Sequence, residues 1–319
     1  LKPDFCAPGC QSDGDSGVTS CAGASGYSAL CGTSMASPTA TGIAALFLQD
    51  WRALYPGTPD PLGSTIKSIF AHTAVDLDDA GPDYRTGYGS IRANAIIDQL
   101  RSGNFVENEV AQGDTYRFIV VVSPGDAQFK ATLAWDDFRG VANVNPNLVN
   151  DLDLVVTSPS GVRHYPWTLN PAIPDNPAIQ TVEDHLNNME QVRVSNPETG
   201  GWVVEVRGTN VPMGPQKFSA AASPLLVNCS DAGGANLDRA QYSCSATSAG
   251  FRVVDCGLNT SDTVIDTVNV LVSSTSNPGG IVVTLSETSA EAATFLGTIP
   301  LTTTNAPGAL QIAANDMIT

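Results

Sequence analysis

The chain has 319 residues, of which 42% are hydrophobic, and 15 basic against 32 acidic side chains give it a formal net charge of −17. A chain of this length is expected to form about two or three domains. No run of 18 apolar residues occurs, which argues against a membrane span, and the acidity argues against a nucleic-acid partner, because phosphates would be repelled.

Residues 1–102 have the pattern of an α/β segment. A stretch rich in Gly, Ser and Cys ends near residue 30, and apolar side chains then recur at helical spacing as far as Trp51. The other faces of this segment hold small, uncharged residues such as Thr41, Gly42 and Ala45, so we expect the helix to be buried on most sides. The predicted helices cover residues 33–51, 62–72 and 91–100.

Residues 103–227 change to the pattern of strands. Short β-branched or aromatic runs alternate with turn signals such as SPGD, SPSG and NPETGG. An antiparallel β-sandwich or jelly roll is the natural architecture for such a segment. The predicted strands cover residues 115–122, 130–135, 152–157, 191–195 and 202–207.

Residues 228–319 again show short strand-like runs separated by turn signals. This pattern predicts a second β-sandwich module. The expected strands cover residues 263–273, 281–287 and 295–301. The chain begins without a signal peptide or a natural start and stops at NDMIT in mid-pattern. We therefore expect it to be the downstream portion of a larger protein.

The seven cysteines fall into a group of four, Cys6, Cys10, Cys21 and Cys31, and a group of three, Cys229, Cys244 and Cys256. None has the C-x-x-C spacing of a zinc site, so disulfides formed in an oxidising compartment are favoured. The first group allows three pairings, among them a bridge from Cys21 or Cys31 across the Gly/Ser-rich loop.

One short segment, Cys31-Gly-Thr-Ser-Met-Ala-Ser-Pro38, has the composition of a nucleophile site. Gly32 permits an unusual backbone, and Ser34 then falls in the first turn of a long helix, where free N–H groups and the positive end of the dipole converge. A serine placed there can attack a carbonyl carbon while backbone N–H groups stabilise the developing oxyanion. An ordinary helix N-cap is the simpler alternative.

The motif GTSMASP resembles the nucleophile motif of subtilisin-like serine proteases. Two flanking segments support the resemblance: KPD-x-x-APG at residues 2–9, and GYG-x-x-x-A at residues 87–93. The resemblance covers residues 1–102, and it implies the C-terminal part of a doubly wound α/β catalytic domain.

The resemblance assigns Ser34 as the nucleophile, Thr33 as a support for the oxyanion site, and Met35 as the oxidation-sensitive residue packed behind the nucleophile. Plain capping for Thr33 and core packing for Met35 remain open. In this family the triad Asp and His, and the Asn that donates to the oxyanion, precede the serine, so they would lie upstream of residue 1. The three histidines, His72, His164 and His185, all follow Ser34. We therefore do not expect this chain to hydrolyse peptides alone.

Residues 103–227 resemble the β-sandwich that follows the catalytic domain in some secreted bacterial subtilases. The segments NDLDL at 150–154 and NNMEQV at 187–192 carry the likeness. Asp151 and Asp153 should share one face of a strand, where with Asp136, Asp137, Asn187 or Glu190 they could hold a structural Ca²⁺. A solvated edge is the alternative, and the chemistry itself requires no cofactor.

These observations predict a secreted serine endopeptidase that acts on proteins or peptides through a Ser34 acyl-enzyme. The alternative is a non-catalytic adhesive or surface-anchoring protein, in which a degenerate protease domain carries β-domains that bind a cell-surface or matrix polymer. The two β-segments make up 217 of the 319 residues (319 − 102). Substrate preference is not readable from this sequence.

Overall fold

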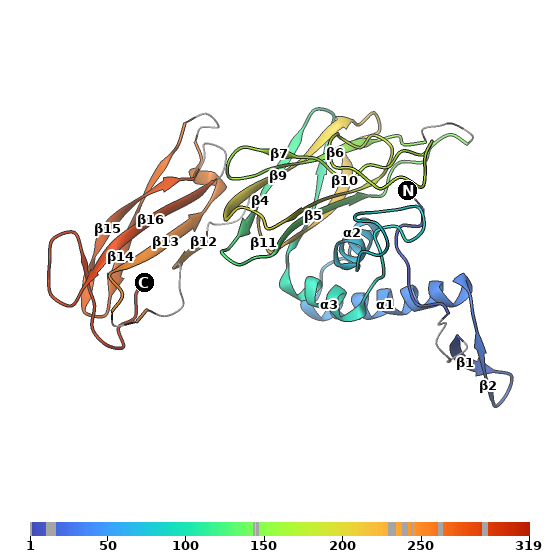
Figure 1. Cartoon of the computed structure of the whole chain (residues 1–319), viewed down its shortest axis with the longest axis horizontal. Coiled ribbons are helices and arrows are strands. Elements are labelled where there is room, and N and C mark those ends of the chain that lie inside the picture. The colour runs from blue at the N-terminus through green and yellow to red at the C-terminus, as the bar shows by residue number, and fades with distance from the viewer. Residues whose placement is uncertain are drawn as a thin grey trace.

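The computed structural model describes residues 2–10, 17–142, 144, 147–228, 234–237, 242–243, 245–260, 264–288 and 293–319. The described part of the chain is mostly β, with 41% of the described residues in strands and 16% in helices. It is elongated: three helices and a hairpin lie toward one end, two sheets occupy the middle, and a third sheet forms the other end (Figure 1). Within the described part, no helix combines the length and the apolarity needed to cross a membrane.

The helices predicted in the first 102 residues are confirmed to within a few residues at each end. They are α1 (Thr33–Leu54), α2 (Gly63–Thr73) and α3 (Ala93–Ser102), and α3 ends at Gly103 in the left-handed conformation. The Gly/Ser-rich stretch contains an antiparallel hairpin of β1 (Val18–Ala22) and β2 (Gly26–Leu30), which was not predicted. No parallel sheet occurs among the described residues of this segment, so the doubly wound arrangement is not confirmed.

The prediction that α1 is buried on most sides is wrong. Only Ile43, Phe47 and Trp51 are buried, and they pack with Phe70 and the apolar residues of α3. Leu46 is 51% exposed, and Thr41, Gly42 and Ala45 are exposed as well. One apolar stripe makes the buried contacts of the helix, and Thr41, Gly42 and Ala45 on its small-residue face stay exposed.

Two antiparallel sheets occupy the middle of the molecule. The first has the strand order β3-β10-β5-β8 and the second β11-β4-β9-β6-β7. The strands are β3 (Phe105–Val110), β4 (Thr115–Val122), β5 (Gln128–Trp135), β6 (Asp151–Thr157), β7 (Arg163–His164), β8 (Met189–Ser195), β9 (Gly200–Asn210), β10 (Gln216–Ser223) and β11 (Leu225–Asn228). All five predicted strands are confirmed.

One apolar core joins these two sheets. Phe129 and Trp135 from the first sheet pack in it with Leu152, Leu154 and Trp202 from the second. The rings of Phe129 and Trp202 stack with their centroids 4.6 Å apart. Each strand contributes alternate residues, as expected for sheets that bury one face.

Helix α2 covers the opposite face of the first sheet through polar contacts. The hydroxyls of Ser64 and Ser219 lie 2.8 Å apart, and Thr65 contacts both Ser219 and Glu107. At the end of the helix, buried His72 places Nδ1 3.1 Å from the Thr132 hydroxyl and Nε2 3.2 Å from that of Ser223. The helices are thereby fixed to the middle sheets.

His72 should make stability depend on pH. Burial, together with the nearby charge of Lys130, lowers the pKa of His72 well below its usual value near 6.5. Below about pH 6.5 the His72 imidazole is protonated in the unfolded chain but stays neutral in the folded chain. The free energy of unfolding therefore decreases as the pH falls. Between pH 7.5 and 5.5, wild type should lose about 1 kcal/mol more unfolding free energy than His72→Gln, measured by urea denaturation. An equal loss in both proteins would contradict this assignment.

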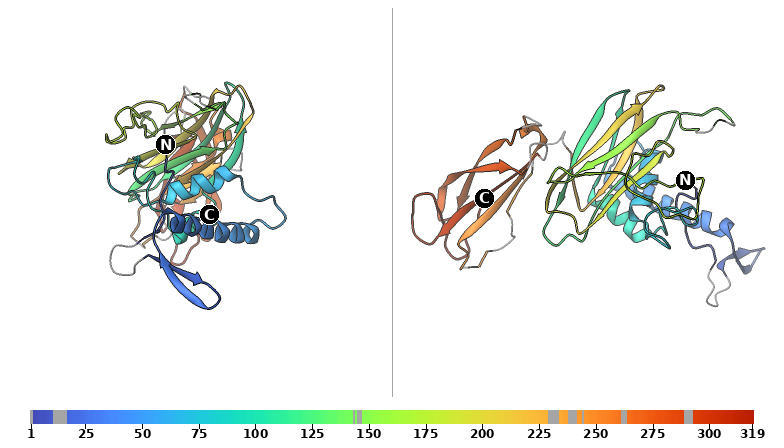
Figure 2. Two further views of the ribbon diagram at one scale, coloured as in Figure 1. Left: turned by 90° about the vertical axis from the view of Figure 1, so that its right-hand side faces the viewer. Right: turned by 45° about the horizontal axis from the view of Figure 1, so that its top comes forward.

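The C-terminal sheet has the order β12-β13-β16-β15-β14, with β17 beside β16. Its strands are β12 (Gly234–Leu237), β13 (Ser248–Val254), β14 (Thr267–Ser274), β15 (Asn277–Glu287), β16 (Thr294–Thr302) and β17 (Leu310–Gln311). The three predicted strands correspond to β14, β15 and β16. Figure 2 shows this sheet beside the middle sheets, and Val254 and Ala293 pack there against Ile119, Val121 and Val203.

Candidate functional site

Ser34 lies in the first turn of the 22-residue helix α1 and is exposed. The residue before the helix, Gly32, has φ 140°, a backbone conformation that side chains other than glycine rarely adopt. Thr33 is also exposed, whereas Met35 is half-buried. Ser34 is therefore an exposed residue at the positive end of a long helix dipole.

The N-terminal segment packs directly on the turn that carries Ser34. The Gly32 N–H donates to the carbonyl of Gly9 at 2.9 Å, and the Thr39 hydroxyl reaches the carbonyls of Met35 and Pro8. A Cβ at Gly9 would lie 2.6 Å from the Gly32 oxygen. This close approach explains the glycine of the APG segment.

The GYG segment is hydrogen-bonded to the same N-terminal segment, residues 2–9. The Tyr88 N–H donates to the Asp4 carbonyl at 2.8 Å, and the Cys6 N–H donates to Gly89 at 2.9 Å. Gly87 has φ 63°, and a Cβ there would lie only 2.3 Å from the Asp4 oxygen. The three motifs read in the sequence thus form one connected structure around the start of α1.

A disulfide joins Cys10 to Cys31, the residue before Gly32. The two cysteines are 21 positions apart, and the loop between them contains the β1–β2 hairpin, which the disulfide ties to the base of the nucleophile turn. Neither Cys6 nor Cys21 forms a disulfide with another described cysteine. Cys229, Cys244 and the side chain of Cys256 lie outside the described residues.

None of the three histidines is hydrogen-bonded to Ser34. His72 is buried at the end of α2, facing the first middle sheet, and His164 packs on Trp202 with ring centroids 5.1 Å apart. His185 lies in an acidic cluster at the edge of the middle sheets. Within the described ranges, Ser34 has neither a general base nor an orienting carboxylate.

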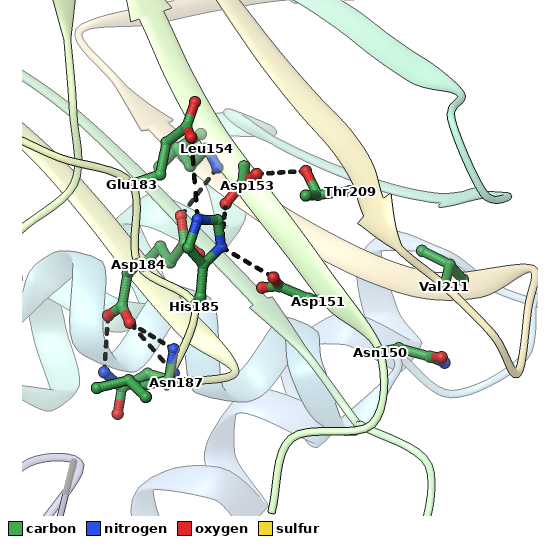
Figure 3. A network of polar contacts seen from close by, with 12 residues as sticks. Asn150, Asp151, Asp153, Leu154, Glu183, Asp184, His185, Asn187, Thr209 and Val211 are labelled. Carbon is green, nitrogen blue, oxygen red and sulfur yellow. Dashed lines mark hydrogen bonds and ion pairs between the residues drawn. The ribbon is translucent and has the colours of Figure 1, made fainter. Parts of the chain in front are cut away.

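The acidic cluster brings Asp151, Asp153 and His185 together (Figure 3). Nδ1 of His185 lies 2.8 Å from Asp151 Oδ2 and 3.4 Å from Asp153 Oδ1. One ligand-type atom from each of the three residues falls within 4.8 Å of the others. Both aspartates thus face one imidazole, while Leu152 and Leu154 lie in the apolar core.

Several buried oxygens of this cluster accept no hydrogen bond from the described residues. They are Oδ1 of Asp151, Oδ1 of Asp153 and Oε1 of Glu190. Glu190 is fully buried, and its other oxygen accepts the Leu154 N–H at 2.8 Å. Buried carboxylate oxygens are costly without a partner, so the cluster can accept a cation or protons.

Burial and mutual repulsion shift the pKa values in this cluster. Burial and the charge of Asp153 raise the pKa of Asp151 to about 6, and burial and the Asp184 charge raise the pKa of Glu190 well above its usual range. Burial opposes a charged imidazole, but the two aspartates outweigh it and raise the pKa of His185.

His185 was not predicted from the sequence as a ligand of this site, although Asp184 and His185 lie just before the NNMEQV segment. The other possible cation ligands predicted from the sequence make different contacts. Asp136 pairs with Lys67 at 2.8 Å, and Asp137 accepts the Val149 and Asn150 N–H groups. Asn187 is bonded to Asp184.

Residues 1–89 match the family model described as the Subtilase family. Curated relatives include two Dictyostelium discoideum proteins called "Serine protease/ABC transporter B family protein". TagB is 23% identical over 81% of this chain and 17% of its own length, and tagA is 27% identical over 69% and 14%. Fervidolysin from Fervidobacterium pennivorans is 27% identical over 44% of this chain and 17% of its own length. The chain thus spans less than a fifth of each relative.

A solved structure, that of the Clostridium perfringens CspB protease, aligns with 38% of this chain and 26% of its own at 12% identity and a TM-score of 0.24. This value is too low to establish a shared fold. The family match and the curated relatives nevertheless agree with the three motifs, and the N-terminal part of the chain is similar to subtilisin-like serine proteases.

Proposed function

We propose that this chain, with its subtilase-like N-terminal part, belongs to a secreted serine endopeptidase in which Ser34 is the nucleophile. The observation that carries the proposal is the exposed Ser34 hydroxyl at the N-terminus of α1, held by the three motif segments. The Cys10–Cys31 disulfide supports secretion, since such bonds persist in oxidising compartments.

In this proposal the Ser34 oxygen attacks the carbonyl carbon of a peptide bond and forms an acyl-enzyme, which water then hydrolyses. Backbone N–H groups at the start of α1 stabilise the oxyanion, with Thr33 in support and Met35 packed behind the nucleophile. No cofactor takes part in these steps. The substrates are proteins or peptides.

The triad His and Asp come, in this proposal, from a catalytic segment additional to residues 1–102. The exposed face of α1 supports this arrangement, because Thr41, Gly42 and Ala45 are small and uncharged, as close helix packing requires. The chain alone should therefore not react with a fluorophosphonate. A longer polypeptide that supplies both residues should carry the adduct on Ser34, as located by peptide mass spectrometry; an adduct on another serine would refute the assignment.

The two β-regions, 103–227 and 228–319, are proposed as β-sandwich domains that follow the catalytic domain. The core shared by the two middle sheets supports the first of them. Exposed apolar side chains on the C-terminal sheet, with Leu271 64% and Val282 61% exposed, favour a second candidate role in adhesion to a surface polymer. Binding of residues 104–319 to such a polymer, together with unchanged polymer binding by the full chain carrying Ser34→Ala, would favour this role over proteolysis.

The cluster at Asp151 and Asp153 is proposed as a structural cation site, with Ca²⁺ as the expected ion. Buried oxygens of Asp151, Asp153 and Glu190 that accept no hydrogen bond from the described residues fit an ion that prefers carboxylate ligands. His185 adds a nitrogen donor, which zinc or manganese would use better than calcium. The bound ion would neutralise the repulsion between these carboxylates and stabilise the edge of the sheet.

Calcium at 100 times its dissociation constant should stabilise the folded chain by about 2.7 kcal/mol. The increment should disappear in the Asp151→Asn/Asp153→Asn variant and persist in Asp175→Asn, whose side chain is 92% exposed. Thermal denaturation with and without Ca²⁺ measures the increment, and parallel melts with Zn²⁺ identify the preferred metal. An equal Ca²⁺ effect in the double variant would exclude this site.

A further inference from the structure

A second polar site is lined by residues from the end of α2, from α3 and from strands β5 and β8 of the first middle sheet. It is an open pocket of about 700 Å³. Its charged lining consists of Arg92, Lys130 and Arg193 with Asp76 and Asp98. Three of the 15 basic residues of the chain thus gather in one place, although the net charge of the whole is −17.

Strand pairing brings two of the lining cations, Lys130 and Arg193, together. Lys130 on β5 and Arg193 on β8 are directly opposed in the antiparallel register, so their side chains emerge on the same face. Like charges in this arrangement destabilise a sheet. Burial, with a contribution from Arg193, lowers the pKa of Lys130 to about 8.

The positive charges of Lys130 and Arg193 are only partly balanced by nearby carboxylates. Arg193 contacts Asp76 at 2.7 Å, and the same Asp76 oxygen also accepts the Gly81 N–H. Lys130 Nζ donates to the carbonyl of His72 at 2.8 Å and has no carboxylate within 4 Å among the described residues. Its ammonium group has three donors, so two remain for another acceptor.

Capping of α2 explains part of this arrangement, since a cation near the last carbonyls of a helix is favourable. It does not explain the opposed Arg193 or the open space above both cations. An anion seated between them would relieve their repulsion and use the remaining donors. Gln128, which also lines the pocket, offers an amide to the same ligand.

We propose that this cationic pocket binds the carboxylate group of a peptide between Lys130 and Arg193. A bare ion would be opposed by the overall negative field of the protein, so the ligand needs further contacts, which the open pocket can provide along a peptide chain. The carboxylate can come from a peptide C-terminus or from an acidic side chain. The proposal does not depend on catalysis by Ser34.

NMR titration of the ¹⁵N-labelled chain tests the proposal with three peptides: acetyl-Ala-Ala-Ala as the free acid, its C-terminal amide, and acetyl-Ala-Glu-Ala amide. A carboxylate-bearing peptide should shift the amide signals of Lys130 and Arg193, whereas acetyl-Ala-Ala-Ala amide should not. Preference for the free acid identifies a C-terminal carboxylate, and preference for the Glu peptide identifies a side chain. Equal shifts with all three peptides, or no shifts with any, would overturn the proposal.

Two variants and one control make the assignment specific. Lys130→Met should weaken binding about 10-fold, the loss expected for a charge-assisted hydrogen bond. Gln128→Glu places a negative charge at the pocket without removing either cation and should also weaken binding. Lys217→Met removes an exposed lysine of β10 outside this pocket and should leave the affinity unchanged. Unchanged affinity in both pocket variants would show that the carboxylate binds elsewhere.

Discussion

Replacing Ser34 by alanine should lower kcat/KM for peptide hydrolysis by about 10⁴-fold or more in a polypeptide that joins this chain to a triad Asp and His. The physical reason is the loss of the attacking oxygen, because alanine has no hydroxyl group. Peptidase assays with a chromogenic peptide measure the loss. Fluorophosphonate labelling should vanish in the same variant.

The matched control is Ser37→Ala, one turn further along the same exposed end of α1. It removes a hydroxyl from the same helix but not from the proposed reaction, so labelling and kcat/KM should stay within a few-fold of wild type. Loss of activity in both variants, with their melting temperatures unchanged, would mean that the region matters without Ser34 being the nucleophile. Retained activity in Ser34→Ala would reject the proposed function directly.

The Gly87→Ala substitution should strongly destabilise the N-terminal part of the structure. Gly87 has φ 63°, and the new Cβ would lie 2.3 Å from the carbonyl oxygen of Asp4, an atom that the backbone cannot easily move. The left-handed conformation alone costs about 1 kcal/mol or more for a residue with a side chain, and the clash adds to that cost. Residues 2–9 should detach from the GYG segment.

Gly103→Ala provides the comparison, because Gly103 has φ 69° but nothing within 4 Å of a Cβ. The difference in unfolding free energy between the two variants therefore measures the close approach rather than the backbone conformation. Hydrogen exchange at the Cys6 and Tyr88 amides should accelerate only in Gly87→Ala. Equal destabilisation, with both amides still protected, would show that residues 2–9 can move aside without cost.

The regular elements were largely predictable because their burial patterns are local. Helix α2 and strands β4 and β6 match the expected ranges closely, since apolar side chains repeat there with the period of the element. Strand β10 was missed because its sequence QKFSAAAS has little intrinsic preference for a strand. Only pairing with β5 and β3 on either side holds it extended.

Burial of α1 was overestimated for a related reason. The small residues on its outer face indicate what the helix can pack against, but whether a partner covers them depends on other segments. In the described structure only the stripe through Phe47 is covered. Composition therefore predicted the capacity for packing, not the packing itself.

The sequence by itself determined the candidate nucleophile, since Gly32, Ser34 and the start of α1 are neighbours along the chain and their geometry is local. It also determined that Asp151 and Asp153 face the same way, because alternation along a strand requires it. Only the tertiary structure brought His185 to these aspartates and placed Arg193 opposite Lys130. Such contacts join residues more than 30 positions apart, and strand register and loop path, which no local pattern encodes, decide them.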